Sequence, residues 1–176
     1  LLGTNLIRKI WKDILNIDLG KEFPVITYEE AMNDYGSDKP DIRFGMKLLD
    51  FQKYINDSNF NTFKDVIQQG GIVKAIICPN VDTYSRKVID ELTDMLKTYY
   101  GVKGLAWMKV KDGKLNGGIS KFFEGDLANQ IISDNKIKDD SIIFLIGDKK
   151  KVVLQALGSL RLELGKREKL IDESKW

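Results

Sequence analysis

Apolar residues recur every three or four positions in several stretches of the chain, and each such stretch predicts an amphipathic helix. The clearest is residues 83–100, where Asp82 or Thr83 can cap the first turn and Gly101 can end the last. The other long helices are expected at residues 2–16, 46–58 and 149–164. Shorter helices are expected at residues 119–123 and 126–132.

Other stretches have the apolar patterns of strands. The predicted strands are residues 60–67, 72–78, 105–110 and 141–146. The first two flank Gly70–Gly71 and could pair as an antiparallel hairpin. The last, SIIFLI, has no polar interruption and predicts a central strand that is buried on both faces. The order of elements predicts an α+β fold, with helices packed on a mainly antiparallel sheet.

Composition narrows the class of protein further. A length of 176 residues fits one medium domain, and 43% apolar residues suffice for a core. The 28 basic and 26 acidic side chains nearly balance, so no global field favours nucleic acid, although a local basic patch is allowed. The chain starts with Leu, and both of its ends are interpreted as cut from a longer protein.

The residues that usually carry catalysis or bind metals are scarce. There is no histidine, and Cys78 is the only cysteine, so we expect a small buried residue there instead of a nucleophile. Neither common phosphate-binding glycine motif occurs. Asp38 and Asp41 could hold Mg²⁺, but a solvated turn explains them as well. The residues alone therefore give no complete catalytic site.

Targeting signals are also missing from the sequence. No apolar run approaches the roughly 20 residues that span a membrane. No basic segment followed by an apolar core marks a signal peptide. We therefore expect a cytoplasmic protein that has no membrane partner.

The stretch FPVITYEEAMNDYGSDKPDIR, residues 23–43, is the most distinctive of the chain. Thr27 and Glu30 have the spacing of a capping box, and Gly36 is expected to end the short helix near Tyr35. The stretch resembles a segment that follows motif 2 of bacterial-type aspartyl-tRNA synthetases. The positions that carry this signature are Tyr35, Gly36, Ser37, Asp38, Lys39, Pro40, Asp41 and Arg43.

The similarity to that family continues along the chain in the family's order. The matching phrases are SRKVIDE at 85–91, GVKGLAW at 101–107, SKF at 120–122, ALGSLR at 156–161 and DESKW at 172–176. The family carries a large insertion, the GAD domain, between its second and third class II motifs. The resemblance assigns residues 1–43 to the flanking catalytic domain, 44–164 to the insertion and 165–176 to the return segment.

The resemblance also implies a function for the parent enzyme. The full enzyme is expected to use ATP and Mg²⁺ to activate aspartate, to transfer it to tRNA, and to form a homodimer. Motif 1, the motif 2 arginine context, motif 3 and the anticodon-binding barrel are absent here. No catalytic, cofactor-binding or metal residue is therefore carried over. The fragment alone is expected to be inactive, to need no cofactor and to be a monomer, and the signature segment is expected to be poorly ordered.

The role of the insertion itself is open between three interpretations. It could face the acceptor arm of tRNA, with Arg86, Lys87, Arg161 and Lys166 as the candidate residues. It could instead be a purely structural or interaction appendage of the synthetase. The same module also occurs in a tRNA-dependent amidotransferase subunit, although the YGSDKPD flank favours the synthetase as host.

Overall fold

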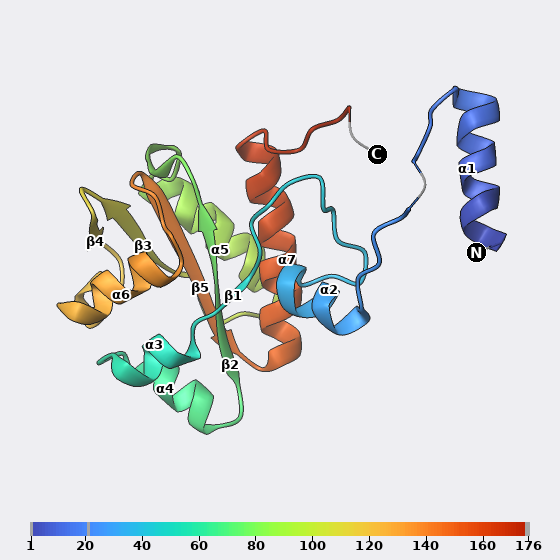
Figure 1. Cartoon of the computed structure of the whole chain (residues 1–176). Coiled ribbons are helices and arrows are strands. Elements are labelled where there is room, and N and C mark those ends of the chain that lie inside the picture. Colours follow the sequence, from blue (N-terminus) through green and yellow to red (C-terminus); the bar gives the residue numbers. More distant parts are fainter. Residues whose placement is uncertain (1, 21, 175–176) are drawn as a thin grey trace.

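A five-stranded antiparallel sheet organises the chain in the computed structural model, which describes residues 2–20 and 22–174 (Figure 1). Every neighbouring pair of strands runs antiparallel, in the order β1-β2-β5-β3-β4. The strands are β1 (Leu49–Asp50), β2 (Ile72–Cys78), β3 (Ala106–Lys111), β4 (Lys114–Asn116) and β5 (Ser141–Asp148). The predicted α+β fold is confirmed.

Helices cover both faces of this sheet and form two cores. The α-helices are α1 (Leu2–Leu15), α2 (Tyr28–Tyr35), α3 (Gln52–Asp57), α4 (Asn61–Gln68), α5 (Arg86–Tyr100), α6 (Asp126–Asp134) and α7 (Lys150–Arg167). Helices α5 and α7 pack on one face, while α3, α4 and α6 pack on the other (Figure 1). The 3-10 turns η1 (Val81–Thr83) and η2 (Ser120–Phe122) lie in the connections.

Strand β5 lies at the centre of the sheet, as its apolar run predicts. Phe144 points into the core beneath α5 and α7, whereas Ile143 and Leu145 belong to the opposite core. A strand that is covered on both faces needs apolar residues at consecutive positions, which is why SIIFLI shows no alternation. The prediction of a buried central strand is confirmed.

The strand predicted at residues 60–67 is wrong, because this stretch forms helix α4. Its apolar residues Phe60, Phe63 and Val66 are three positions apart, a spacing that places them on one side of a helix. The predicted hairpin between residues 60–67 and 72–78 is therefore also wrong. Strand β2 pairs with β1 on one side and with β5 on the other.

Other boundaries differ from the sequence-based expectation by a few residues. The stretch 46–58 divides into strand β1 and the short helix α3. Helix α5 begins at Arg86, and its N-cap is Ser85, whose hydroxyl accepts the Val88 N–H, so neither Asp82 nor Thr83 caps it. Residues 120–122 form a 3-10 turn where an α-helix was expected. The remaining predicted helices and strands match in type and nearly in length.

Helix α1 lies apart from the sheet and its helices (Figure 1). It has no buried residue, although its sequence is clearly amphipathic. The exposed apolar side chains on α1 are Leu2, Leu6, Ile7, Ile10, Ile14 and Leu15. Among the described residues, no helix is both long enough and apolar enough to cross a bilayer.

Candidate functional site

The signature segment begins at the C-terminal end of helix α2. Thr27 and Glu30 form the predicted capping box, in which the Thr27 hydroxyl accepts the Glu30 N–H and the Glu30 carboxylate accepts the Thr27 N–H. These hydrogen bonds hold the pKa of Glu30 below its usual range. Gly36 ends the helix with a left-handed backbone at φ 70°, and its N–H donates to the Met32 carbonyl. Both predicted ends of this helix are confirmed.

Gly36 also marks the closest approach between α2 and α7. A Cβ atom at Gly36 would collide with the Leu154 carbonyl oxygen and would lie 2.8 Å from the Gly158 Cα. A Cβ atom at Gly158 would in turn lie 2.5 Å from the Gly36 carbonyl oxygen. Two glycines therefore allow the backbone of the signature segment to lie directly on helix α7.

Arg161 of α7 fixes the chain that follows this contact. Its guanidinium donates through Nε to one main-chain carbonyl and through Nη2, whose two hydrogens are shared, to three more. The acceptors are the carbonyl oxygens of Asp41, Phe44, Gly45 and Met46, at 2.8–2.9 Å. Its planar group also lies 3.9 Å from the centroid of the Phe44 ring and 4.9 Å from that of Tyr35. We call Arg161 with these four carbonyls and two rings the arginine clamp.

The arginine clamp corrects the prediction for Arg161. This side chain is only 1% exposed, so it does not face RNA. Burial lowers the pKa of its guanidinium, and Tyr35 and Asp41 partly offset that effect. The position was recognisable in the sequence, because Arg161 follows Leu157 by four residues and precedes Leu164 by three, on the apolar side of α7.

The clamp also gives the signature segment contacts within this chain. Residues 36–46 touch α7 through the glycine contact and through Arg161. Whether the segment is poorly ordered in the isolated chain stays a prediction. Within the segment, the Ser37 hydroxyl accepts the Lys39 N–H at 3.1 Å. The segment thus forms a seam against α7.

Asp41 forms an ion pair with Arg43 within this segment. Its carboxylate accepts two hydrogen bonds from the Arg43 guanidinium, at 3.0 and 2.8 Å, and one from the Arg43 N–H. These bonds hold the pKa of Asp41 below its usual range. Asp38, the other candidate Mg²⁺ ligand, is exposed. The described residues contain no group of three or more His, Cys, Asp or Glu side chains that could hold a metal ion.

The two stretches at the predicted domain boundaries lie side by side. The pKa of Arg43 is raised, mainly by its hydrogen bond to Asp41 and further by the nearby carboxylates of Asp172 and Glu173. The Phe44 ring also fills the space where Gly165 of α7 has no side chain. We call these two adjoining stretches, residues 41–46 and 165–173, the neck of the domain.

A second contact ties the C-terminal end of α7 to the start of α5. The Tyr84 hydroxyl donates to the Glu168 carboxylate at 2.8 Å, and the Asn80 amide donates to the same carboxylate. Cys78 lies behind them with its Sγ 3.1 Å from the Tyr84 hydroxyl, and burial raises its pKa to about 12. Cys78 is fully buried, as expected.

The same contact places three of the predicted RNA-facing residues at one end of the layer that α5 and α7 form. Arg86 and Lys87 begin α5, just after Tyr84, and Lys166 lies two residues before Glu168. All three are exposed, and Arg86 is paired with Asp90 at 3.2 Å. We call these three residues the basic end. The sequence alone could not bring Lys166 close to Arg86, because that neighbourhood depends on the antiparallel packing of two distant helices.

Comparison with known proteins assigns a class to this fold. The family model of the GAD domain matches residues 63–157, which contain α4, the strands β2 to β5 and the first part of α7. The chain therefore belongs to the GAD domain family. The match lies within residues 44–164, where the insertion is predicted, while the two predicted boundaries stay predictions.

The most similar curated proteins extend the likeness beyond that domain to nearly the whole chain. An aspartate–tRNA ligase of Halalkalibacterium halodurans is 45% identical, and one of Clostridium novyi is 43% identical. An aspartate–tRNA(Asp/Asn) ligase of Aquifex aeolicus is 44% identical. Each similarity covers 99% of this chain and 29% of the relative, so the chain spans less than a third of the relatives' length. The described part of the DESKW phrase ends at Ser174, and Lys175 and Trp176 lie outside the described residues.

Proposed function

We propose that this chain is the GAD-domain portion of a class II aspartate–tRNA ligase. The observation that carries the proposal is the 42–45% identity to such ligases along 99% of the chain, including the signature segment outside the GAD match. The parent would activate aspartate with ATP and Mg²⁺, transfer it to tRNA, and act as a cytoplasmic homodimer.

This portion contributes architecture and no chemistry of its own. The ATP and metal sites would belong to other parts of the parent. Purified alone, the chain should catalyse no aspartate-dependent exchange of pyrophosphate into ATP. Exchange above a no-protein control would contradict the proposal, and an intact aspartate–tRNA ligase supplies the positive control.

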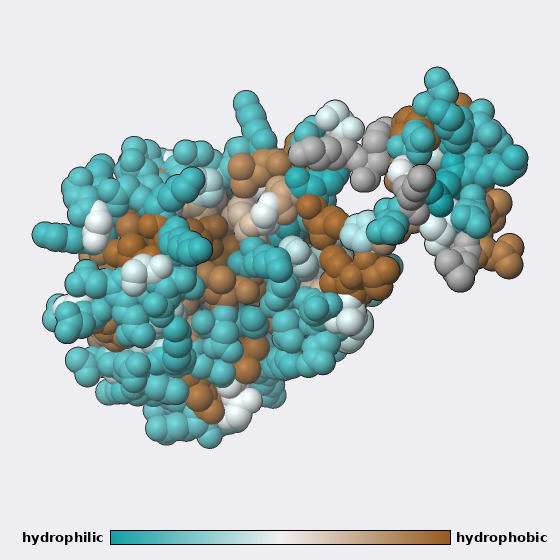
Figure 2. Space-filling view, viewed as in Figure 1, coloured by the Kyte–Doolittle hydropathy of each residue, from teal (hydrophilic) through white to brown (hydrophobic). Residues whose placement is uncertain are grey.

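Docking onto the rest of the ligase is supported by the exposed apolar side chains of α1 and of the segment before α2. Val25 is 93% exposed and Tyr28 is 72% exposed. Figure 2 shows apolar surface around α2 and the chain that leads to it. Scattered apolar side chains on a surface need no partner, but six exposed on a single helix favour a partner surface. The remaining two thirds of the ligase would supply that surface.

Contact with tRNA is the second part of the proposal, and the basic end supports it. Arg86, Lys87 and Lys166 are exposed on two helices that meet at one end. Such side chains bind phosphates in a salt-dependent manner. The triple variant R86Q/K87Q/K166Q should bind tRNA more weakly than the wild type. The double variant K150Q/K151Q, at the opposite end of α7, should bind tRNA like the wild type.

A further inference from the structure

The hairpin of β3 and β4 carries lysines on a single face. Trp107, Lys109 and Lys111 alternate along β3, so they share one side of the sheet. The register places Asn116 opposite Lys109 and Lys114 opposite Lys111, and directly opposed residues share a face. We call Lys109, Lys111 and Lys114 with Asn116 the lysine face.

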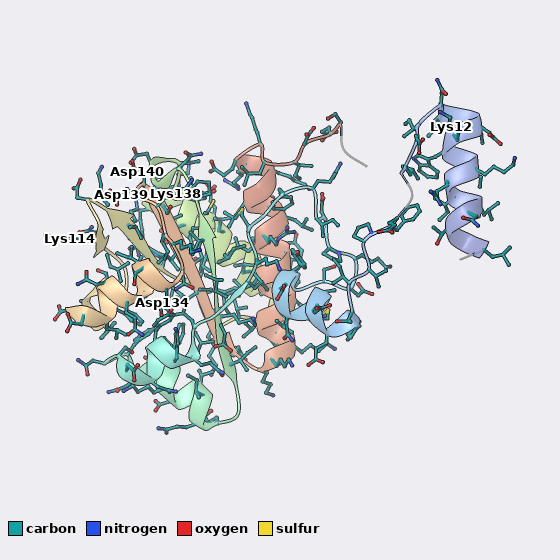
Figure 3. All side chains as sticks on the ribbon, in the orientation of Figure 1. Lys12, Lys114, Asp134, Lys138, Asp139 and Asp140 are labelled. Atoms are coloured by element: carbon teal, nitrogen blue, oxygen red, sulfur yellow. The ribbon has the colours of Figure 1, made fainter. Side chains whose placement is uncertain are left out.

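The other side of the hairpin is packed, whereas the lysine face is open. Met108, Val110 and Leu115 belong to the core that contains α6. The lysine face lies on the side of α5 and α7, where a hollow of about 320 Å³ opens beside it. Val81, Asp82, Lys109, Lys111, Asp112 and Asn116 line this hollow. Figure 3 shows Lys114 at the outer edge of the sheet.

The pairing of Lys111 with Lys114 is unfavourable for the fold. Like charges directly opposite each other on neighbouring strands destabilise a hairpin. Among the described residues, none of the three lysines forms an ion pair with a carboxylate. In the described part of the chain, Lys109 has its Nζ 6.0 Å from the Trp107 ring centroid. The charges at positions 111 and 114 therefore form no close ion pair within the described residues.

Two carboxylates near the hairpin, those of Asp112 and Asp139, belong to residues that take part in its turn. Asp112 and Gly113 form the two-residue turn, with φ values of 52° and 68°, a geometry that favours this Asp-Gly pair. The Asp139 carboxylate accepts the Gly113 N–H at 2.8 Å, next to Lys138 and Asp140 in Figure 3. Asp82 lines the hollow, and it lies only four residues before Arg86. The hollow thus lies between the lysine face and the turn that leads into α5.

We propose that the lysine face binds RNA phosphates and extends the tRNA contact of the basic end across the hairpin. This inference rests on the proposed function. A phosphate between Lys111 and Lys114 removes their mutual repulsion, so bound RNA stabilises the arrangement that costs free energy in its absence. A partner that carries no negative charge would gain nothing from two opposed cations at this position.

The test uses the chain itself, a tRNA transcript and the double variant K111Q/K114Q. Both side chains are exposed, so the variant should fold, and its thermal midpoint should equal or exceed that of the wild type. Its affinity for tRNA at about 50 mM salt should fall roughly tenfold or more, and the slope of log K against log salt should decrease by about 2. K150Q/K151Q carries the same change in net charge and serves as the control.

The outcomes separate this inference from the proposed function. If the wild type does not bind tRNA, the proposed tRNA contact fails, and the lysine face fails with it. If the wild type binds and R86Q/K87Q/K166Q weakens binding while K111Q/K114Q does not, the inference alone is overturned. The lysines would then only prevent the edge strand from pairing with strands of other molecules, as lysines on edge strands do. Equal competition by polyglutamate of matched charge would also overturn the assignment to RNA.

Discussion

Arg161 is the largest side chain that is fully buried in the described part of the chain, and main-chain carbonyls accept all of its hydrogen bonds. A buried cation is tolerated only where its donors are satisfied. Here four carbonyls accept from Nε and Nη2, and two aromatic rings lie against the guanidinium. The arginine clamp therefore makes one side chain of α7 responsible for the path of the signature segment.

Replacing Arg161 should destabilise the whole domain. In R161M, four main-chain carbonyls lose their donor, one of them fully buried and three partly buried, and we expect the free energy of unfolding to fall by about 3 kcal/mol or more. R161K should lose most of the same stability, because an ammonium cannot reproduce the planar fork. Urea denaturation measures both. R167M is the control, since the pair of Arg167 with Glu163 is partly exposed and should contribute less than about 1 kcal/mol.

Gly36 and Gly101 form a matched pair for testing the seam. Both end a helix in the left-handed region, at φ 70° and 68°, so alanine costs backbone strain at either position. Only Gly36 has backbone atoms of α7 in the space of a Cβ atom, whereas Gly101 is open. G36A should therefore lose at least about 1 kcal/mol more stability than G101A. Equal losses in chemical denaturation would show that the close approach of α2 and α7 does not matter.

Cys78 should be inert in the folded protein. Burial raises the pKa of its thiol to about 12, and the reactive thiolate forms only as the pH approaches that value. At pH 8 the native chain should react with a thiol reagent only as fast as it unfolds, while the urea-unfolded chain should react at once. Rapid labelling of the native protein at pH 8 would contradict the buried position.

The elements differ in how far the sequence could specify them. Helix α5 and strand β5 each have a long, regular apolar pattern, and both were predictable. Helix α4 was missed although the spacing of its apolar residues is helical, because the stretch is short and those residues are the aromatic and β-branched types that strands favour. Strands β1 and β4 have two and three residues and exist only through their neighbours. The position of Arg161 on the apolar side of α7 was readable from the sequence, but its carbonyl partners, more than 100 residues away, were not.

Helix α1 should contribute little to the stability of the rest of the chain. It buries no residue, so deleting residues 1–20 should change the free energy of unfolding by less than about 0.5 kcal/mol. L157A in α7 is the contrasting variant, because it empties a fully buried site and should cost about 2–5 kcal/mol. A loss of comparable size after deleting α1 would mean that the helix packs on this domain after all.

At the scale of the whole molecule, the two segments of the neck adjoin at one corner of the domain. A domain inserted into a larger protein needs this arrangement, because its two connections must return to the same place. The arginine clamp fixes one of them, and the contact of Glu168 with Tyr84 holds the other near the basic end. The basic end and the lysine face would then have a fixed orientation relative to the rest of the ligase.

The most direct test of this account is the affinity of the wild-type chain for tRNA, measured across a range of salt concentrations. Five exposed cations are assigned to phosphates: Arg86, Lys87, Lys111, Lys114 and Lys166. We predict binding in the micromolar range at low salt, with a slope of log K against log salt of about −4. A wild-type chain that shows no binding at about 50 µM and 50 mM salt, or binding that does not depend on salt, would contradict the account.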